Sequence, residues 1–156
     1  MTPELPGEVD AAGTDPQHAD LPELRILGVH QSVILVADDE PPMRNLVTLL
    51  LLNHGYVVTS AADGHEGLEL SRKYLGKIDL LITDVEMPRM NGTDLAGHLL
   101  EERPEIKVMV MSGKDMNEIV SQNINMPFLP KPFDEQTLRA RITEVLAAPG
   151  NAAQGG

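Results

Sequence analysis

The sequence predicts an α/β fold in which a doubly wound, five-stranded parallel sheet carries helices on both faces. Three observations support this prediction: short continuous apolar runs, intervening segments with helical spacing of apolar residues, and capping or turn residues at the junctions. A continuous apolar run that is rich in β-branched residues suits a strand buried on both sides. Because strand-like and helix-like segments alternate along the chain, we expect successive βα units and therefore a parallel sheet.

The five expected strands are short and mostly apolar, and they lie at residues 32–37, 57–61, 80–83, 108–111 and 128–129. The fifth strand, which starts with Phe128 and Leu129, is expected to be very short.

Four of these strands are followed by a segment in which apolar residues recur with helical spacing. Residues 41–54 are expected to form a helix with one apolar face, which comprises Met43, Leu46, Val47, Leu50 and Leu51. Gly55 stands at the position where a left-handed residue commonly ends a helix. The expected capping residues of the helices after strands two, three and five are Asp63, Asn91 and Asp134. Residues 115–122 are expected to form a weak helix at best.

The two ends of the chain differ in composition from the part between them. Residues 1–31 contain six acidic residues, one basic residue and four prolines, which predicts an acidic, disordered N-terminal extension. Within it, residues 21–29 are more apolar, and both docking on the domain and a flexible linker are left open. Residues 148–156 are expected to be a flexible tail. The expected folded domain therefore comprises residues 32–147.

Charge and composition argue against several classes of partner. The net charge is -12, with 12 Lys and Arg against 24 Asp and Glu, so we expect no direct binding of nucleic acid. No apolar run is long enough to cross a membrane, and no membrane partner is expected. The chain has no cysteine, which excludes disulfides and thiolate chemistry and fits a cytoplasmic location.

Carboxylates stand at the carboxyl ends of the first and third expected strands, where open parallel sheets bind their ligands. Asp38 and Asp39 follow the first strand, and Asp84 ends the third. If these strands are neighbours, the carboxylates converge and repel one another. A divalent cation such as Mg²⁺, which prefers oxygen ligands, would compensate that repulsion. Taken singly, an aspartate at a strand end is usually a turn or helix-capping residue, and either Asp38 or Asp39 could be only that.

Two further strand ends supply a hydroxyl and an ammonium group. Ser112 ends the fourth strand, and Lys131 follows the fifth between Pro130 and Pro132, which stiffen the backbone. A lysine ammonium suits a carboxylate or a phosphate. A single serine before glycine is usually a turn residue, and a single lysine is usually a solvated charge. The combination of four strand ends nevertheless favours one functional site.

These residues resemble the receiver domain of two-component response regulators, and especially the stand-alone, chemotaxis-regulator-like receivers. The similarity covers about residues 32–147 and is carried by residues 34–40, 81–88, 91–92, 110–113 and 131–133. It implies the flavodoxin-like receiver fold, in which the five strands have the order 2-1-3-4-5.

The resemblance also implies a role for each matching residue. Asp84 would be the phosphoacceptor, and its donor would be a phosphohistidine on a sensor histidine kinase or a histidine phosphotransfer protein. Asp39, Asp84 and the backbone carbonyl of Glu86 would bind Mg²⁺ directly. Asp38 would hold the ion through water. Lys131 would pair with Asp84 at rest and with the phosphoryl group afterwards.

A phosphorylation-dependent change of the protein-binding surface is implied as well. Ser112 would move to bond the phosphoryl oxygens and free space for Phe128, although a plain core role for Phe128 is left open. The altered surface would then be recognised by an unknown downstream protein. Glu86 and Lys114 occupy positions at which the family tunes the attack of water on the phosphoaspartate. We expect a Glu–Lys pair to cross the site and slow hydrolysis.

The sequence departs from the family pattern between Ser112 and Phe128. This segment is short, and residues 123–127 replace the usual Gly-Ala turn, so the fourth helix is expected to be shortened or partly unwound. Gly97 is expected to cost the third helix up to ~1 kcal/mol relative to Ala.

The favoured interpretation is a single-domain response regulator that catalyses its own phosphorylation and dephosphorylation without being a conventional enzyme. Three alternatives remain: a phosphorelay intermediate, a receiver-like interaction module that works without phosphorylation, and a Mg²⁺-dependent phosphotransferase or phosphatase acting on small substrates. The complete set of acids, hydroxyl and ammonium argues against the interaction module. The lack of a segment long enough to form a substrate-binding cap argues against the small-substrate enzyme.

Overall fold

The computed structural model describes residues 32–114 and 126–149. In this part of the chain, the strands are β1 (Val33–Ala37), β2 (Val57–Ala61), β3 (Leu80–Asp84), β4 (Lys107–Ser112) and β5 (Phe128–Pro130). All neighbouring strands are parallel, and the order is β2-β1-β3-β4-β5. The predicted sheet and its order are therefore confirmed.

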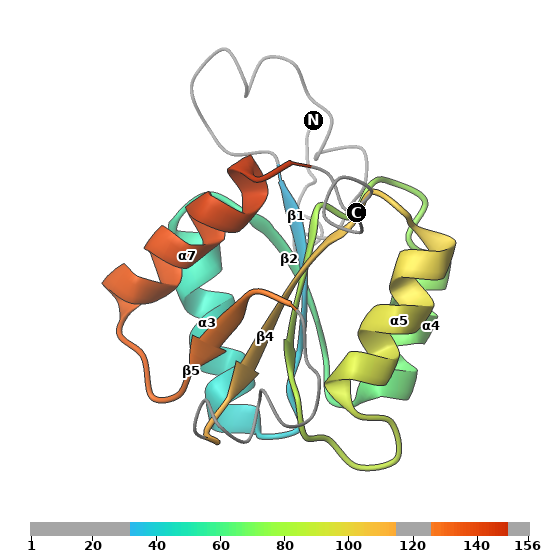
Figure 1. Cartoon of the computed structure of the whole chain (residues 1–156), viewed down its shortest axis with the longest axis horizontal. Coiled ribbons are helices and arrows are strands. Elements are labelled where there is room, and N and C mark those ends of the chain that lie inside the picture. Colours follow the sequence, from blue (N-terminus) through green and yellow to red (C-terminus); the bar gives the residue numbers. More distant parts are fainter. Residues whose placement is uncertain (1–31, 115–125, 150–156) are drawn as a thin grey trace, which may run out of the picture.

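Helices cover both faces of this sheet. The described helices are α3 (Pro41–Asn53), α4 (Gly64–Lys73), α5 (Gly92–Glu102) and α7 (Glu135–Ala147). Figure 1 shows α3 and α7 on one side of the sheet and α4 and α5 on the other. The doubly wound architecture predicted from the alternation of segments is thus confirmed.

Alternate residues of the strands build a separate apolar core on each face. In β1, Ile34 and Val36 belong to the cluster beneath α3 and α7, whereas Val33 and Leu35 belong to the cluster beneath α4 and α5. All residues of β1 are buried, as expected for a central strand of a parallel sheet. This central position places the residues that follow β1 in the middle of the sheet's carboxyl edge.

The expected helix caps form as predicted. The side chains of Asp63, Asn91 and Asp134 accept backbone N–H groups of Glu66, Asp94 and Thr137, respectively. Gly55 has a φ of 89°, the left-handed conformation expected after α3. These caps fix where α4, α5 and α7 begin, and hence the loops at the carboxyl edge of the sheet.

The predicted apolar face of α3 is wrong at one residue. Val47 and Leu51 are buried, and Met43 and Leu50 pack against the core, but Leu46 is 45% exposed. The side of α3 that faces the core is centred on Val47 and Leu51. Leu46 therefore turns to the solvent side of the helix.

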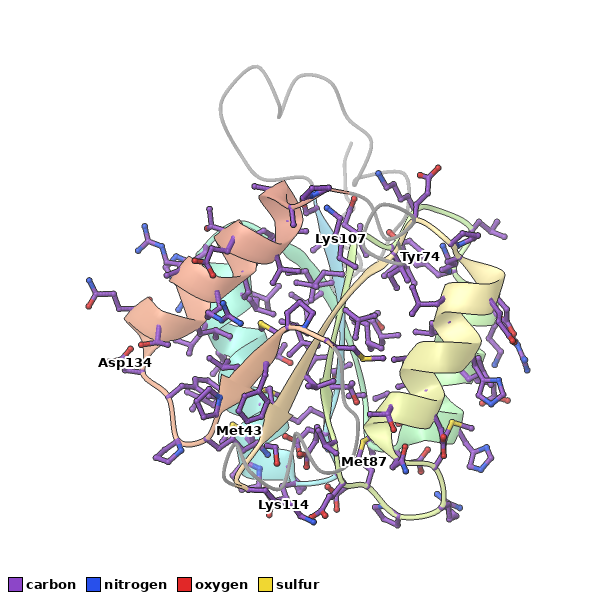
Figure 2. The ribbon with its side chains drawn as sticks, viewed as in Figure 1. Met43, Tyr74, Met87, Lys107, Lys114 and Asp134 are labelled. Atoms are coloured by element: carbon purple, nitrogen blue, oxygen red, sulfur yellow. The ribbon has the colours of Figure 1, made fainter. Side chains whose placement is uncertain are left out.

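The amino edge of the sheet is held by side chains that bind backbone carbonyls. Arg103 donates to the Ser71 hydroxyl and to the carbonyls of Ser71, Tyr74 and Gly76. The Lys107 ammonium, at the start of β4, donates to the carbonyl of Ala148, at 2.6 Å, after the end of α7. Figure 2 shows Lys107 and Tyr74 at the same end of the molecule.

Several expectations concern residues that the structure does not describe. The N-terminal extension at residues 1–31, the weak or shortened helix at residues 115–122 and the tail from residue 150 onward all lie outside the described residues. The proposed domain limits stay predictions. Within residues 32–114 and 126–149, no helix combines the length and apolar character needed to cross a bilayer.

Candidate functional site

Three aspartates converge at the carboxyl edge of the sheet. Asp38 follows β1, with Asp39 beside it, and Asp84 ends β3. Because Ala37 pairs with Thr83 in the sheet, the two strand ends are level with each other. One carboxylate oxygen from each of the three residues lies within 4.8 Å of the others. The predicted acidic cluster is therefore present.

The three carboxylates differ in burial. Asp38 is fully buried and Asp84 is 8% exposed, whereas Asp39 is half-buried. The backbone N–H of Asp38 donates to the carbonyl of Ala61 at 3.1 Å, which holds the β1 end against the end of β2. Asp38 Oδ1 accepts the backbone N–H of Glu40 at 2.9 Å. Asp38 Oδ2 is thereby turned toward the interior of the cluster.

Lys131 supplies positive charge inside this cluster. Its Nζ lies 3.3 Å from Asp38 Oδ2 and 3.5 Å from Asp84 Oδ2, and 3.9 Å from Glu40 Oε1. The backbone N–H of Lys131 donates to the carbonyl of Ser112, which extends the pairing of β5 with β4. The peptide bond between Lys131 and Pro132 is cis. Lys131 thus makes the contact with Asp84 that the family resemblance implied.

Burial raises the pKa of Asp84 from 3.8 to about 6. Lys131 counteracts part of this effect, and the nearby charges of Asp38 and Asp39 add to it. The ionised form of Asp84 is therefore disfavoured in the folded protein, and a further cation bound beside it would reduce this penalty. A carboxylate with a raised pKa is also more basic, which suits a nucleophile.

The donor set fits a hard divalent cation. Three carboxylates face one ammonium group, so negative charge exceeds positive charge in the cluster when all are ionised. Carboxylate oxygens within a few ångströms of one another are the ligands that Mg²⁺ prefers. These residues could hold Mg²⁺, with Asp39 and Asp84 as the predicted direct ligands.

Ser112 and Phe128 lie on neighbouring strands beside the acidic cluster. Ser112 is buried at the end of β4, and its hydroxyl accepts the backbone N–H of Lys114 at 3.0 Å. Phe128 starts β5 opposite Val110 and is half-buried against the core beneath α4 and α5. Their roles in a switch stay predictions.

Glu86 and Lys114 form an ion pair between the loops that follow β3 and β4. The two loops flank Asp84 and Ser112, the last residues of these strands. Figure 2 shows Lys114 and Met87 at the same edge of the molecule. The ion pair therefore bridges two loops of the site, as predicted, and its effect on hydrolysis stays a prediction.

Gly92 lets α5 begin directly against Asp84. A Cβ at position 92 would lie 2.0 Å from the backbone oxygen of Asp84 and 2.9 Å from Thr83 Oγ1. The Gly92 N–H also donates to the carbonyl of Val85 at 2.8 Å, which closes the base of the loop. The sequence pattern included this glycine without indicating its contact.

Sequence reasoning missed a second ion pair near the site. Arg89, in the loop between β3 and α5, has a φ of 70° and pairs with Asp63, the cap of α4. The two residues are 26 positions apart. No spacing rule connects them, because their proximity follows from the packing of α4 beside α5.

Comparison with known proteins agrees with this architecture. Residues 34–143 match the response regulator receiver domain, and the chain belongs to this family. Receiver domains of this family are components of two-component signal transduction, in agreement with the resemblance inferred from the sequence.

Two relatives each match about three quarters of this chain. The sensor kinase CckA of Brucella abortus (strain 2308) is 33% identical over 119 residues, covering 74% of this chain and 12% of that protein. The transcriptional regulatory protein PdtaR of Mycobacterium tuberculosis (strain ATCC 25618 / H37Rv) is 34% identical over 130 residues, covering 77% and 62%. The chain thus spans less than two thirds of either relative.

A solved structure supports the same fold. The response regulator protein TrrA of Thermotoga maritima, determined in complex with Mg²⁺-BeF, is similar with a TM-score of 0.61 and 28% sequence identity. The match covers 73% of this chain and 98% of that chain.

Proposed function

We propose that this chain accepts a phosphoryl group on Asp84 from a phosphohistidine, in a reaction that depends on Mg²⁺. The donor is a sensor histidine kinase or a histidine phosphotransfer protein. The observation that carries the proposal is the surroundings of Asp84, a buried carboxylate that faces two further carboxylates and one ammonium group. Aspartyl phosphates form by attack of such a carboxylate on phosphorus. Membership of the receiver family supports the same function.

In the proposed reaction, a carboxylate oxygen of Asp84 attacks the phosphorus of the donor. The bond between phosphorus and the imidazole nitrogen breaks, and its electron pair returns to the imidazole. Lys131, 3.5 Å from Asp84 Oδ2, stabilises the charge on the transferred phosphoryl oxygens. Ser112, which ends the neighbouring strand, donates its hydroxyl to one of these oxygens.

The remaining acidic residues hold the cation. Asp39, Asp84 and the Glu86 carbonyl are the proposed direct ligands, and Asp38 acts through water. Bound Mg²⁺ neutralises charge on the phosphoryl oxygens, which lets them approach the carboxylates. Asp38 also orients Lys131, because its Oδ2 lies 3.3 Å from the Lys131 ammonium.

The proposed output is a change of the protein-binding surface. When Ser112 bonds the phosphoryl group, it gives up its contact with the Lys114 N–H, and the loop after β4 moves with it. Phe128 on β5 then occupies the space that is freed. An unidentified downstream protein recognises the resulting surface.

Intact mass spectrometry tests the chemistry directly. The chain is incubated with acetyl phosphate, with and without Mg²⁺, beside the variants Asp84→Asn and Asp94→Asn. Asp94 is an exposed acid at the start of α5 and serves as the matched control. We expect one phosphoryl adduct that requires Mg²⁺, is lost in Asp84→Asn and persists in Asp94→Asn.

An adduct retained by Asp84→Asn would contradict the assigned phosphoacceptor. Lack of an adduct, together with failure to bind beryllofluoride and Mg²⁺, would instead support an interaction module that works without phosphorylation. Return of the phosphoryl group to a histidine phosphotransfer protein would identify a phosphorelay intermediate.

A further inference from the structure

We propose that the ion pair between Asp63 and Arg89 is a positioning element of the cation site, although neither residue contacts the acidic cluster. The pair holds the loop between β3 and α5, which carries the Glu86 carbonyl. This inference rests on the proposed Mg²⁺-dependent function. Within that function, it assigns a task to the loop between β2 and α4, which supplies no ligand.

The loop between β2 and α4 contacts both loops that carry the proposed ligands. At its start, the Ala61 carbonyl accepts the backbone N–H of Asp38 at 3.1 Å. At its end, the Asp63 carboxylate pairs with the Arg89 guanidinium. The two ligand-bearing loops, which already meet through the pairing of β1 with β3, are therefore also connected through the end of β2 and the loop that follows it.

The position of the Asp63 side chain is fixed because its two carboxylate oxygens have different partners. Oδ1 accepts the backbone N–H of Glu66 at 2.8 Å and caps α4, while Oδ2 accepts from Arg89. Glu66 in turn accepts the backbone N–H of Ala62 at 2.6 Å. Both contacts of Asp63 lower its pKa, with the Glu66 N–H as the larger cause. Asp63 is therefore anionic at neutral pH and rigidly attached to a helix end.

Arg89 has a backbone conformation that a non-glycine residue adopts at a cost. Its φ of 70° is left-handed, and the next turn is tight, since Met90 N donates to the Pro88 carbonyl at 2.7 Å. Glycine would adopt this conformation more easily. An arginine at this position is therefore best explained by what its side chain contributes, which is the contact with Asp63.

A second contact joins the same two loops. A Cβ at Gly64 would lie 2.8 Å from Cβ and Cγ of Met90, so the start of α4 lies directly against the loop. The base of the loop is closed by the hydrogen bond from Gly92 to Val85. The Arg89 contact holds the far side of the loop, opposite that base.

Magnesium titration of the unphosphorylated full chain, followed by backbone amide NMR shifts, tests the inference without phosphorylation. The variants are Arg89→Gly, which tolerates the left-handed φ but removes the ion pair, and Arg89→Lys, which keeps the positive charge. The matched control is Arg72→Ala, which removes an ion pair between α4 and α5 at their far ends, with Glu102.

We expect Arg89→Gly to bind Mg²⁺ about two- to fivefold more weakly, the range for one exposed ion pair. Arg89→Lys should recover most of the affinity, and Arg72→Ala should bind as the wild type does. Urea unfolding of each variant separates an effect on the site from an effect on the fold.

Wild-type affinity in Arg89→Gly would overturn the inference. Equal weakening in Arg89→Gly and Arg72→Ala would overturn it as well, because the effect would then be general. The wild-type titration reports on the proposed function itself, since a chain that binds no Mg²⁺ fails there. The ratio between variant and wild type reports on the positioning role.

Discussion

Replacing Asp84 with Asn should stabilise the metal-free fold, even though it abolishes the proposed chemistry. The carboxyl of Asp84 has a pKa of about 6 in the folded protein and 3.8 as a reference value. Between these values the folded state binds more protons than the unfolded state does. Stability therefore falls as the pH rises through this window, and the penalty is complete above the folded pKa.

The size of the effect follows from the two pKa values. The difference between 3.8 and about 6 corresponds to a penalty of about 3 kcal/mol near pH 7.5 and about 1 kcal/mol near pH 4.5. Asn removes the ionisation and therefore the penalty. We expect Asp84→Asn to raise the free energy of unfolding by up to about 3 kcal/mol at pH 7.5.

Urea unfolding in the presence of EDTA, followed by circular dichroism, measures this difference at both pH values. Glu101→Gln, which changes an exposed carboxylate on α5, is the control and should alter stability by less than about 0.5 kcal/mol. Saturating Mg²⁺ should reduce the advantage of the variant, because the cation binds the folded wild type.

The reasoning would be refuted if Asp84→Asn were no more stable than the wild type at pH 7.5 in EDTA. An advantage of the same size at pH 4.5 would also refute it, because the gain would then not arise from ionisation.

Three further predictions concern the loops of the site and the helix α5 that follows one of them. Glu86→Ala or Lys114→Ala removes the ion pair between the two loops, which should let water attack the phosphoaspartate more easily. The half-life of phosphorylated Asp84, measured by mass spectrometry, should shorten about two- to fivefold. Unchanged half-lives would contradict the idea that this ion pair slows hydrolysis. Gly92→Ala should cost more than about 2 kcal/mol in urea unfolding, because its Cβ would meet the Asp84 carbonyl. In contrast, Gly97→Ala should gain up to about 1 kcal/mol, since a Cβ there meets no atom within 4 Å among the described residues; equal stabilities would contradict the close approach at Gly92.

The sheet and the acidic cluster were predictable because they depend on local patterns and one topological rule. The β-branched apolar runs identify the strands, and capping residues such as Asp63 and Asn91 locate the helix starts. Parallel strands then end at one edge, which brings Asp38 and Asp84 together without knowledge of any side-chain contact.

The missed features depend on contacts between residues distant in sequence. Arg103 binds carbonyls about thirty residues earlier, and Arg89 binds Asp63, 26 positions earlier. Neither arginine belongs to a periodic pattern, so nothing in the sequence selects these partners. The helical spacing places Leu46 on the wrong side of α3, because it defines a broad stripe and the neighbouring strands determine which part of that stripe is buried.

Lys107 and the start of β1 show how this domain can be joined to other sequences. Ser32 precedes β1, and Ala148, bound by Lys107, follows α7. Figure 1 shows the start of β1 and the end of α7 at the end of the molecule away from the carboxyl edge. Both connection points therefore lie on the side of the sheet remote from Asp84. A domain with this arrangement can be built into a longer protein, as its match to 12% of a sensor kinase illustrates, while the carboxyl edge of the sheet lies on the side away from both connections.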